Sequence, residues 1–386
     1  MTVYPDQERI RRLRTARGIT QADLAAQLGM PASALSRILA GRLPIEPADA
    51  GRLAHILGCE NSLLAKPVAD ALHTRPWLRA YADAPKKAVE QYVEDTLLAV
   101  ECFEALRLKQ VPERLPAFTG DLNDADDIDE FAGHVRDAAD IPPHQPVPNV
   151  TRAAERLGCL VLPLDSELGK HLGMSLFVDG TPVMRVSRAV PSGNVPGDRQ
   201  RFTLSHELGH LTLHASIPPP DTAEQAKFIE TQAHRFAGAF LLPGDAFLQD
   251  LDDAGGRVTL TTLSRLKGRW GVSIKAMVVR LQQIHRIDPN QARSLYKQIS
   301  ARGWNKAEPV DVGNERAVWL SKALSRRFHT DDPAASAAES VGLDRSYIDS
   351  WMAWEAGHDA HVLEFPQQAS RGASSHSARS ATITRL

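Results

Sequence analysis

The sequence predicts a mostly α-helical protein with one small β-sheet, which is an α+β fold. Three observations lead to this class. Short amphipathic stretches closed by glycines fill the first sixty residues, and two long stretches with helical apolar spacing cover about 198–214 and 222–242. Only the region around 159–187 changes to short apolar runs, two of which flank an Asp-Gly pair. The sheet is therefore expected to be small and the helices to dominate.

Composition limits the class of protein further. A length of 386 residues predicts two or three domains, and 43% hydrophobic with 24% charged residues is ordinary for globular proteins. The formal net charge of −2 gives no overall attraction to nucleic acid, so any such site must be local. Three widely spaced cysteines exclude a disulfide framework and a thiolate zinc cluster. We find no signal peptide or membrane span, and a cytoplasmic location is expected.

The first unit, 1–65, should contain helices at 6–17, 21–28, 32–39 and 48–57. Gly18, Gly29, Gly41 and Gly58 follow these stretches, where a left-handed helix cap is usually needed. Thr20 is placed to cap the second helix. The sequence therefore predicts a compact bundle of short helices.

The remaining chain divides by composition and periodicity. A helical connector at 66–117 carries one strong helix at 85–109, which Pro112 and Pro116 end. The unit 118–250 should hold a helix to about 139, a Pro-rich linker at 141–148, a helix at 150–157, the small sheet and the two long helices. A helical C-terminal region, 251–365, follows, and the Ser/Ala/Arg-rich tail at 366–386 is predicted to be disordered.

The most specific motif is His206-Glu207-Leu208-Gly209-His210, an H-E-x-x-H pattern within a helix. Residues four apart share one helix face, so both histidines can bind one ion with Glu207 beside an open coordination position. Catalytic zinc usually has three protein ligands and a water. The pattern therefore predicts a catalytic metal site with Glu207 as general base.

The third ligand can be sought on either long helix. His214 has a suitable side chain, but it lies about 12 Å of helix rise from His206, at ~1.5 Å per residue. Glu230, on the next helix, is the better candidate because an antiparallel helix can bring it to the metal. Zinc suits a His₂Glu ligand set, although Mn²⁺ or Fe²⁺ could also occupy it.

The segments RFTLSHELGHLTLH (201–214) and ETQAHRFAGAFLLP (230–243) resemble the ImmA/IrrE family of zinc metallopeptidases. The resemblance extends over about 115–309 and implies a zincin-like domain with His206, His210 and Glu230 as ligands. His234 stands where the family usually has Asp or Asn, which implies a role in hydrogen bonding a ligand histidine. The strands near 175–187 could hold an extended substrate by edge pairing.

The run from Ile10 to Gly29 resembles the lambda-repressor-like XRE family of helix-turn-helix domains, over about 8–58. The resemblance implies that the helix at 32–39 enters the major groove of a double-stranded DNA operator, which a homodimer would read as a palindrome. Base contacts are then expected from Ser33 and Arg37, with Ser36 on the same outward face. Phosphate contacts are expected from Gln21, Arg42, Arg11 and Arg14.

Three functions remain open from the sequence. The first is a DNA-binding transcriptional regulator whose zinc endopeptidase cleaves a repressor or antitoxin-like protein, or its own linker near 141–148, in a stress or phage response. The second is a repressor whose peptidase-like domain senses a ligand or metal and does not cleave. The third is a peptidase whose N-terminal bundle binds its protein substrate instead of DNA.

Overall fold

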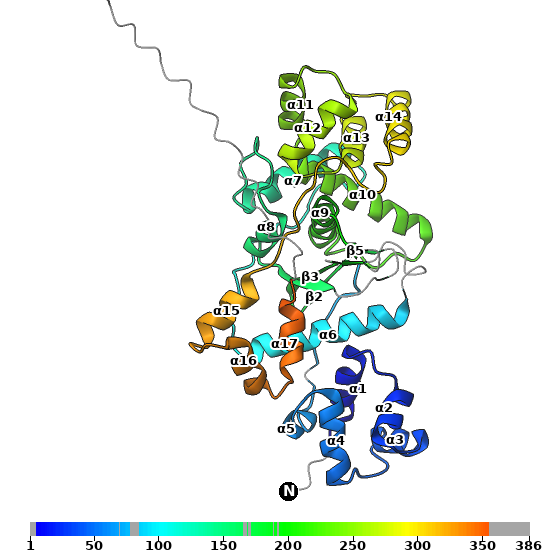
Figure 1. Cartoon of the computed structure of the whole chain (residues 1–386), viewed down its shortest axis with the longest axis vertical. Coiled ribbons are helices and arrows are strands. Elements are labelled where there is room, and N and C mark those ends of the chain that lie inside the picture. The colour runs from blue at the N-terminus through cyan, green and yellow to red at the C-terminus, as the bar shows by residue number, and fades with distance from the viewer. Residues whose placement is uncertain are drawn as a thin grey trace, which may run out of the picture.

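The structure of the chain is a computed structural model. It describes residues 5–354 except 69, 78–84, 165–167, 169–170, 188 and 191–192, so the predicted disordered tail lies outside the described residues. No helix among the described residues is long and apolar enough to cross a membrane. The fold is mostly helical with a small central sheet, as predicted (Figure 1).

The N-terminal domain is a bundle of five helices, α1 (Gln7–Ala16), α2 (Gln21–Leu28), α3 (Ala32–Leu39), α4 (Pro47–Leu57) and α5 (Asn61–Leu64). Thr20 and Asp23 form a capping box at the start of α2, and Gly29 ends the helix in the left-handed conformation. Leu13, Leu24 and Leu35 are fully buried between these helices. The local signals in the sequence therefore account for α1–α4, whereas the short helix α5 was not predicted.

Helix α6 (Lys86–Ala105) packs along α1 and is joined to it by charged side chains. Arg9 and Arg12 are both buried, and their guanidinium groups pair with Glu101; Arg12 also pairs with Glu94. The helix is four residues shorter than expected at its C-terminal end, because Leu106 caps it and Arg107 turns to a φ of 51°. The predicted connector is thus an integrated part of the core.

Three C-terminal helices return to the N-terminal half of the molecule. These are α15 (Trp319–Arg327), α16 (Pro333–Val341) and α17 (Arg345–Met352). The Tyr347 hydroxyl donates to the Leu57 carbonyl at 2.8 Å, and Phe103 of α6 meets Trp351 edge-on. One hydrophobic core therefore joins α1–α6 with α15–α17.

The central sheet separates this core from a second one. Its strands are β1 (Leu160–Leu164), β2 (Gly173–Val178) and β3 (Thr181–Ser187), in the order β1-β3-β2. Strand β3 pairs in parallel with β1 and antiparallel with β2, which leaves β2 at an edge. Alternate side chains point to opposite faces, so Leu162 enters the first core and Val161 the second. A two-stranded ribbon, β4 (Ala189–Val190) and β5 (Gly193–Asn194), follows.

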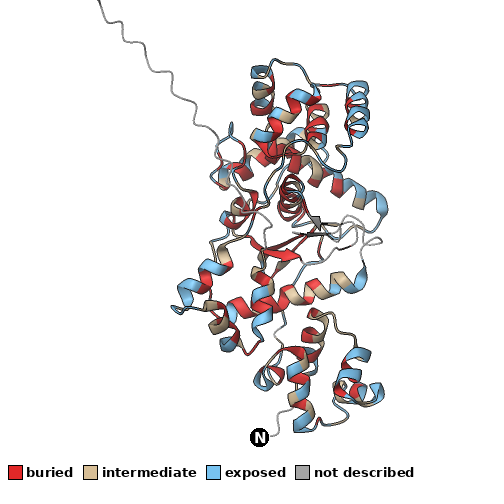
Figure 2. Ribbon diagram, in the orientation of Figure 1, coloured by how far each residue is buried: buried red, intermediate tan, exposed pale blue. Residues whose placement is uncertain are grey.

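The second core lies on the other face of the sheet and contains the motif helix (Figure 2). Its helices are α7 (Ala125–Ala138), α8 (Val150–Arg156), α9 (Gly197–Leu213), α10 (Ala223–Leu241), α11 (Gly244–Asp253), α12 (Leu260–Trp270), α13 (Ile274–Gln283) and α14 (Pro289–Ala301). A Cβ on Gly209 would lie 3.0 Å from the Phe236 ring, so glycine allows α9 and α10 to approach closely. The C-terminal helices are thus divided between two cores instead of packing as one unit.

The Pro-rich segment 141–148 is held to the domain around it. Arg136, itself buried, donates to the carbonyls of Pro142 and Gln145, and Arg201 donates to the carbonyl of Val147. Ile141 and Val147 are buried in the second core. The segment is therefore a fixed part of the fold, which disfavours it as an accessible cleavage site.

Candidate metal centre and nucleic-acid interface

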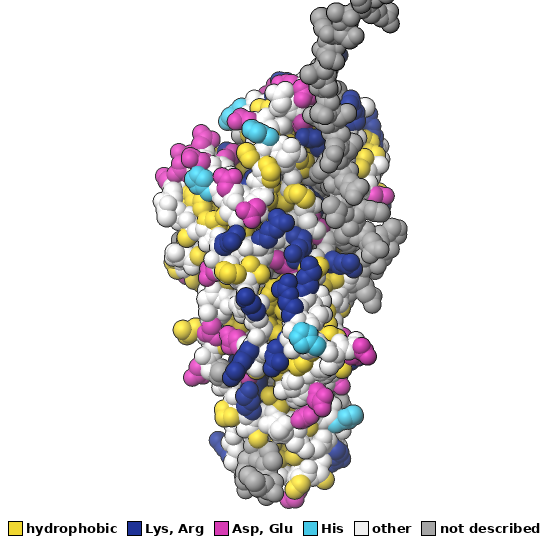
Figure 3. Space-filling view, turned by 90° about the vertical axis from the view of Figure 1, so that its left-hand side faces the viewer, with side chains coloured by type: hydrophobic (Ala, Val, Ile, Leu, Met, Phe, Trp, Pro, Cys, Tyr) yellow, Lys and Arg dark blue, Asp and Glu magenta, His cyan; other side chains and the backbone are white. Residues whose placement is uncertain are grey.

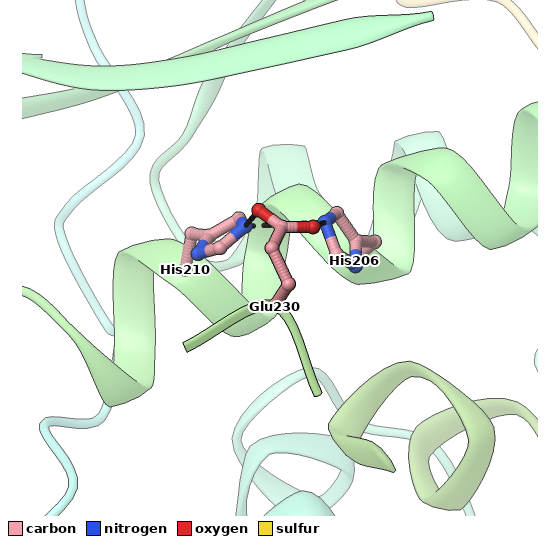
Figure 4. A group of neighbouring side chains, drawn as sticks. All are labelled: His206, His210 and Glu230. Atoms are coloured by element: carbon pink, nitrogen blue, oxygen red, sulfur yellow. Dashed lines mark hydrogen bonds and ion pairs between the residues drawn. The ribbon is translucent and has the colours of Figure 1, made fainter. Parts of the chain in front are cut away.

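Helices α9 and α10 bring three predicted ligands together (Figure 4). The Nε2 atoms of His206 and His210 lie 3.1 Å apart. Each lies 3.3 Å from a different carboxylate oxygen of Glu230. The i, i+4 spacing on α9 aligns the two imidazoles, and α10 carries the carboxylate across to them.

The separations among these atoms fit a small tetrahedral ion. Zinc bonds of roughly 2.0–2.1 Å at tetrahedral angles place neighbouring ligand atoms about 3.3–3.4 Å apart. The separations between the two histidine Nε2 atoms, and between each Nε2 and its Glu230 oxygen, are 3.1–3.3 Å. In addition, Glu230 Oε2 is buried with no hydrogen-bond partner among the described residues. Two nitrogens and a carboxylate in this arrangement match the ligand set that zinc prefers.

A chain of hydrogen bonds fixes the tautomer of His210. The Gln232 side-chain nitrogen donates to the Leu122 carbonyl at 2.8 Å, which turns its oxygen toward His214 Nε2 at 3.0 Å. His214 must therefore donate from Nε2 and accept at Nδ1, where His210 Nδ1 lies at 3.0 Å. His210 consequently carries its proton on Nδ1 and directs the Nε2 lone pair at the candidate site.

The sequence did not reveal this role of His214, although its spacing of four from His210 was a usable signal.

Burial lowers the pKa of His210 to about 4, partly against the effect of Glu230. Burial, followed by the charge on His210, lowers the pKa of His214 to about 3. Both imidazoles are therefore neutral near pH 7, as metal ligation requires.

His234, which was predicted to hydrogen-bond a ligand histidine, lies beside His206. The His234 ring meets the His206 ring edge-on at 4.5 Å, and His234 Nδ1 lies 2.8 Å from the Glu230 carbonyl of its own helix. His206 Nδ1 is buried and has no hydrogen-bond partner among the described residues. His234 thus packs against the ring of His206. Among the described residues, no hydrogen-bond chain like the one that fixes the His210 tautomer reaches His206 Nδ1.

Glu207 lies on α9 under the first residues of β2. Its Oε2 accepts a 2.6 Å hydrogen bond from the Ser175 hydroxyl. Burial raises the pKa of Glu207 to about 7, against the lowering effects of His206 and Ser175. A Cβ on Gly173 would lie 2.7 Å from Thr203 and 3.0 Å from Glu207, so only glycine fits there without displacing them.

The edge of β2 beside these groups is covered by residues 72–77, which precede α6 in the chain. The backbone N–H groups of Thr74 and Trp77 donate to the carbonyls of Phe177 and Ser175, both at 3.0 Å. The Trp77 ring stacks on the His210 ring, with centroids 5.6 Å apart and an angle of 4°. This segment was not predicted to approach the site.

A cleft of about 1150 Å³ lies near the candidate centre, although none of the three candidate ligands lines it. Phe202 and His234 line it near the histidines, and Lys275 and Trp304 line it farther away. The buried ammonium group of Lys267, at the wall of the cleft, forms ion pairs with Asp198 at 2.6 Å and with Glu308 at 2.7 Å. The cleft is therefore linked to the candidate centre by His234, whose ring packs on the ring of His206.

The helix-turn-helix residues divide into two groups. Ser33, Ser36 and Arg37 on α3 and Arg42 after it are exposed, and Gln21 is half-buried at the start of α2. These positions are compatible with the predicted DNA contacts.

The α1 arginines that were predicted to contact phosphates already have partners in the protein. Arg11 pairs with Glu8 and, at 2.7 Å, with Glu94 of α6. Arg14 donates to the Ile19 carbonyl at 2.8 Å. The structure thus directs these arginines toward the protein, and the phosphate role predicted for them has no support in the geometry.

Positive charge gathers elsewhere on the molecule. Figure 3 shows Lys and Arg side chains in a stripe over the face that carries α8 and α15. The segment 107–114 lies against both helices, because Trp319 donates to the Lys109 carbonyl and Arg114 to the Leu157 carbonyl. Exposed cations of these elements are Arg107, Lys109, Arg114, Arg156, Lys322, Arg326 and Arg327.

Comparisons with known proteins agree with this organisation. Residues 154–282 match the family model described as an IrrE N-terminal-like domain, in the peptidase M78 group. Residues 8–66 match a family model described as a helix-turn-helix domain. No curated protein matches the chain. The chain therefore combines a helix-turn-helix domain, typical of DNA-binding regulators, with a metallopeptidase-like domain of the ImmA/IrrE type, as the sequence predicted.

Proposed function

We propose that this protein is a DNA-binding transcriptional regulator with a zinc-dependent endopeptidase domain. The observation that carries the proposal is the convergence of His206, His210 and Glu230 next to the buried carboxylate Glu207. The buried Glu230 Oε2, which has the His206 nitrogen at 3.3 Å but no well-formed hydrogen bond, and a histidine held in the ligating tautomer support metal binding over a purely structural cluster. The M78 match supports peptide hydrolysis as the chemistry.

In this proposal His206, His210 and Glu230 hold zinc. Zinc, when bound, supplies Lewis acidity that activates a water and stabilises the negative charge on a peptide oxygen. Glu207 accepts the proton of the attacking water at Oε1, while Ser175 keeps Oε2 in place. Glu207 then delivers that proton to the leaving amine nitrogen. Burial raises the pKa of the Glu207 carboxyl, which favours a group that can both accept and release a proton.

We assign the DNA-binding half to α2 and α3. In this assignment Ser33, Ser36 and Arg37 face base edges, while Gln21 and Arg42 contact phosphates. A homodimer would place two such helices on a palindromic operator. The protein substrate would be a repressor or antitoxin-like protein whose cleavage changes transcription under stress or phage attack.

The alternative is a repressor whose metal site senses an ion and does not cleave. One observation favours it: residues 72–77 cover the strand edge beside the centre. A covered site can bind a metal while it excludes substrate.

The peptidase proposal is tested with the zinc-loaded full chain and its Glu207→Gln variant. Both are expected to retain one zinc per chain, measured by mass spectrometry, because Glu207 is not a ligand. A peptide library supplied in large excess should be cleaved by the native chain and not by the variant. Cleavage by the variant would refute the role of Glu207, and loss of zinc from it would refute the ligand assignment.

The DNA-binding proposal is tested by operator selection followed by substitution. Arg37→Ala with Arg42→Ala should lower operator affinity at least tenfold, since each removes a charged contact. Arg52→Ala is the matched control, because Arg52 is 58% exposed and pairs with Asp49 on α4. Equal affinities in the native chain and the double variant would contradict the assignment.

A further inference from the structure

The covered edge of β2 suggests how the candidate peptidase is regulated. The strand is the edge of the sheet, and its first residues lie over Glu207. Ser175 connects two parts of the site, because its hydroxyl donates to Glu207 and its carbonyl accepts from Trp77. Any extended peptide that approached the centre along β2 would need the same backbone groups.

Residues 72–77 already use those groups as an antiparallel strand would. Thr74 both donates from its N–H to the Phe177 carbonyl and accepts the Phe177 N–H at its Oγ1, each at 3.0 Å. Leu72 and Asp179 exchange a second pair of bonds, both 2.8 Å. The contacts thus extend along β2 from Asp179 to Ser175, next to the metal centre.

Trp77 brings this segment into contact with the candidate metal centre. Its ring lies parallel to the ring of His210 and also contacts His214 at 5.6 Å. It therefore covers one ligand and the histidine that fixes that ligand's tautomer. An aromatic ring stacked on imidazole contributes favourable energy beyond its buried area.

We propose that residues 72–77 are an internal competitor that occupies the substrate strand of the peptidase, so that a protein substrate must displace them. This inference rests on the proposed function. It also describes the substrate class: an extended segment that pairs antiparallel to β2, with an aromatic side chain at the place of Trp77.

The tether makes this competitor effective. Arg9 holds the carbonyls of Lys66 and Pro67 before the segment, and α6 begins at Lys86 after it. A segment tethered at both ends acts at an effective concentration on the order of millimolar. A free peptide with the same contacts therefore competes poorly until the internal contacts are weakened.

The experiment measures binding instead of cleavage. The probe is a fluorescent synthetic peptide with the sequence of residues 70–77, added to the full-length Glu207→Gln chain and followed by anisotropy. Thr74→Ala with Trp77→Ala removes one hydrogen-bond acceptor and the ring stack, so the probe should bind about tenfold to a hundredfold more tightly. Leu72→Ala is the matched control, because the Leu72 side chain is 82% exposed and should leave affinity unchanged.

Equal probe affinity in all three chains would overturn the proposal. Hydrogen exchange in the chain without segment substitutions gives a second test that does not depend on variant folding. The amides of Thr74 and Trp77 should exchange slowly and lose protection when the probe saturates the protein. Protection that persists with the probe bound would also overturn the proposal.

These readouts separate the inference from the proposed function. If the probe binds as expected but the zinc-loaded chain that carries Thr74→Ala with Trp77→Ala and keeps Glu207 cleaves nothing, the peptidase function fails. The competitor assignment would stand in that case, because it was measured by binding alone.

Discussion

Replacing His214 with phenylalanine should weaken zinc binding without removing a ligand. In the native chain His214 Nδ1 accepts the proton of His210 at 3.0 Å, and this contact keeps the His210 Nε2 lone pair free. Phenylalanine cannot accept it, so His210 gains by moving its proton to Nε2, which lies 3.3 Å from Glu230. A His210 ring protonated on Nε2 cannot bind a metal through that nitrogen. Zinc binding must then include the cost of moving the proton back to Nδ1.

The loss of such a partner typically costs tenfold to a hundredfold in metal affinity, or about 1.4–2.7 kcal/mol. Affinity is measured by competition with a chromophoric zinc chelator at one fixed pH, because ligand protonation also affects binding. Thr212→Val is the control, since the Thr212 hydroxyl is buried on the same helix but donates to the Leu208 carbonyl at 2.8 Å. Native affinity in the His214 variant, or an equal loss in both variants, would refute the relay.

Three further outcomes follow from the packing. Glu315→Ala should lower the free energy of unfolding by about 3–5 kcal/mol in urea, because it leaves the guanidinium of Arg201, 2% exposed, without its carboxylate; a loss below about 1 kcal/mol would be inconsistent with that pair. Gly173→Ala should slow cleavage about tenfold with zinc affinity unchanged, since the new methyl displaces Glu207, and unaltered turnover would show that the close approach is unimportant. Cys159 is 2% exposed and burial raises the pKa of its thiol, so a thiol reagent at about pH 8 should label it only after unfolding; rapid labelling of Cys159 in the native chain would contradict its burial.

Local signals predicted the motif helix and the candidate ligand from α10. Spacing of four on α9 places two imidazoles on one face regardless of what surrounds the helix, so His206 and His210 converge from the sequence alone. Glu230 required only that the next helix run back along α9. The glycine caps of the N-terminal bundle were similarly local, and the structure confirms those at Gly29 and Gly58.

Long-range pairing could not be predicted in the same way. An arginine-rich α1 resembles a DNA-facing helix, but the carboxylates that pair with Arg9 and Arg12 lie more than eighty residues away on α6. Helical periodicity shows that a face is buried, not which element buries it. This explains why the C-terminal helices were expected to form one region, and why residues 72–77, with no strand pattern, were not expected on β2.

The central claim is that Glu207 and its neighbouring ligands cut peptide bonds in a regulatory protein. The most direct test compares new protein N-termini in cells that express the native chain and in cells that express Glu207→Gln, before and after DNA damage. The account predicts a small set of cuts that appear only with Glu207 present, within a repressor or antitoxin-like protein. Identical N-termini in both cell lines under several stresses would contradict it and favour the non-cleaving sensor.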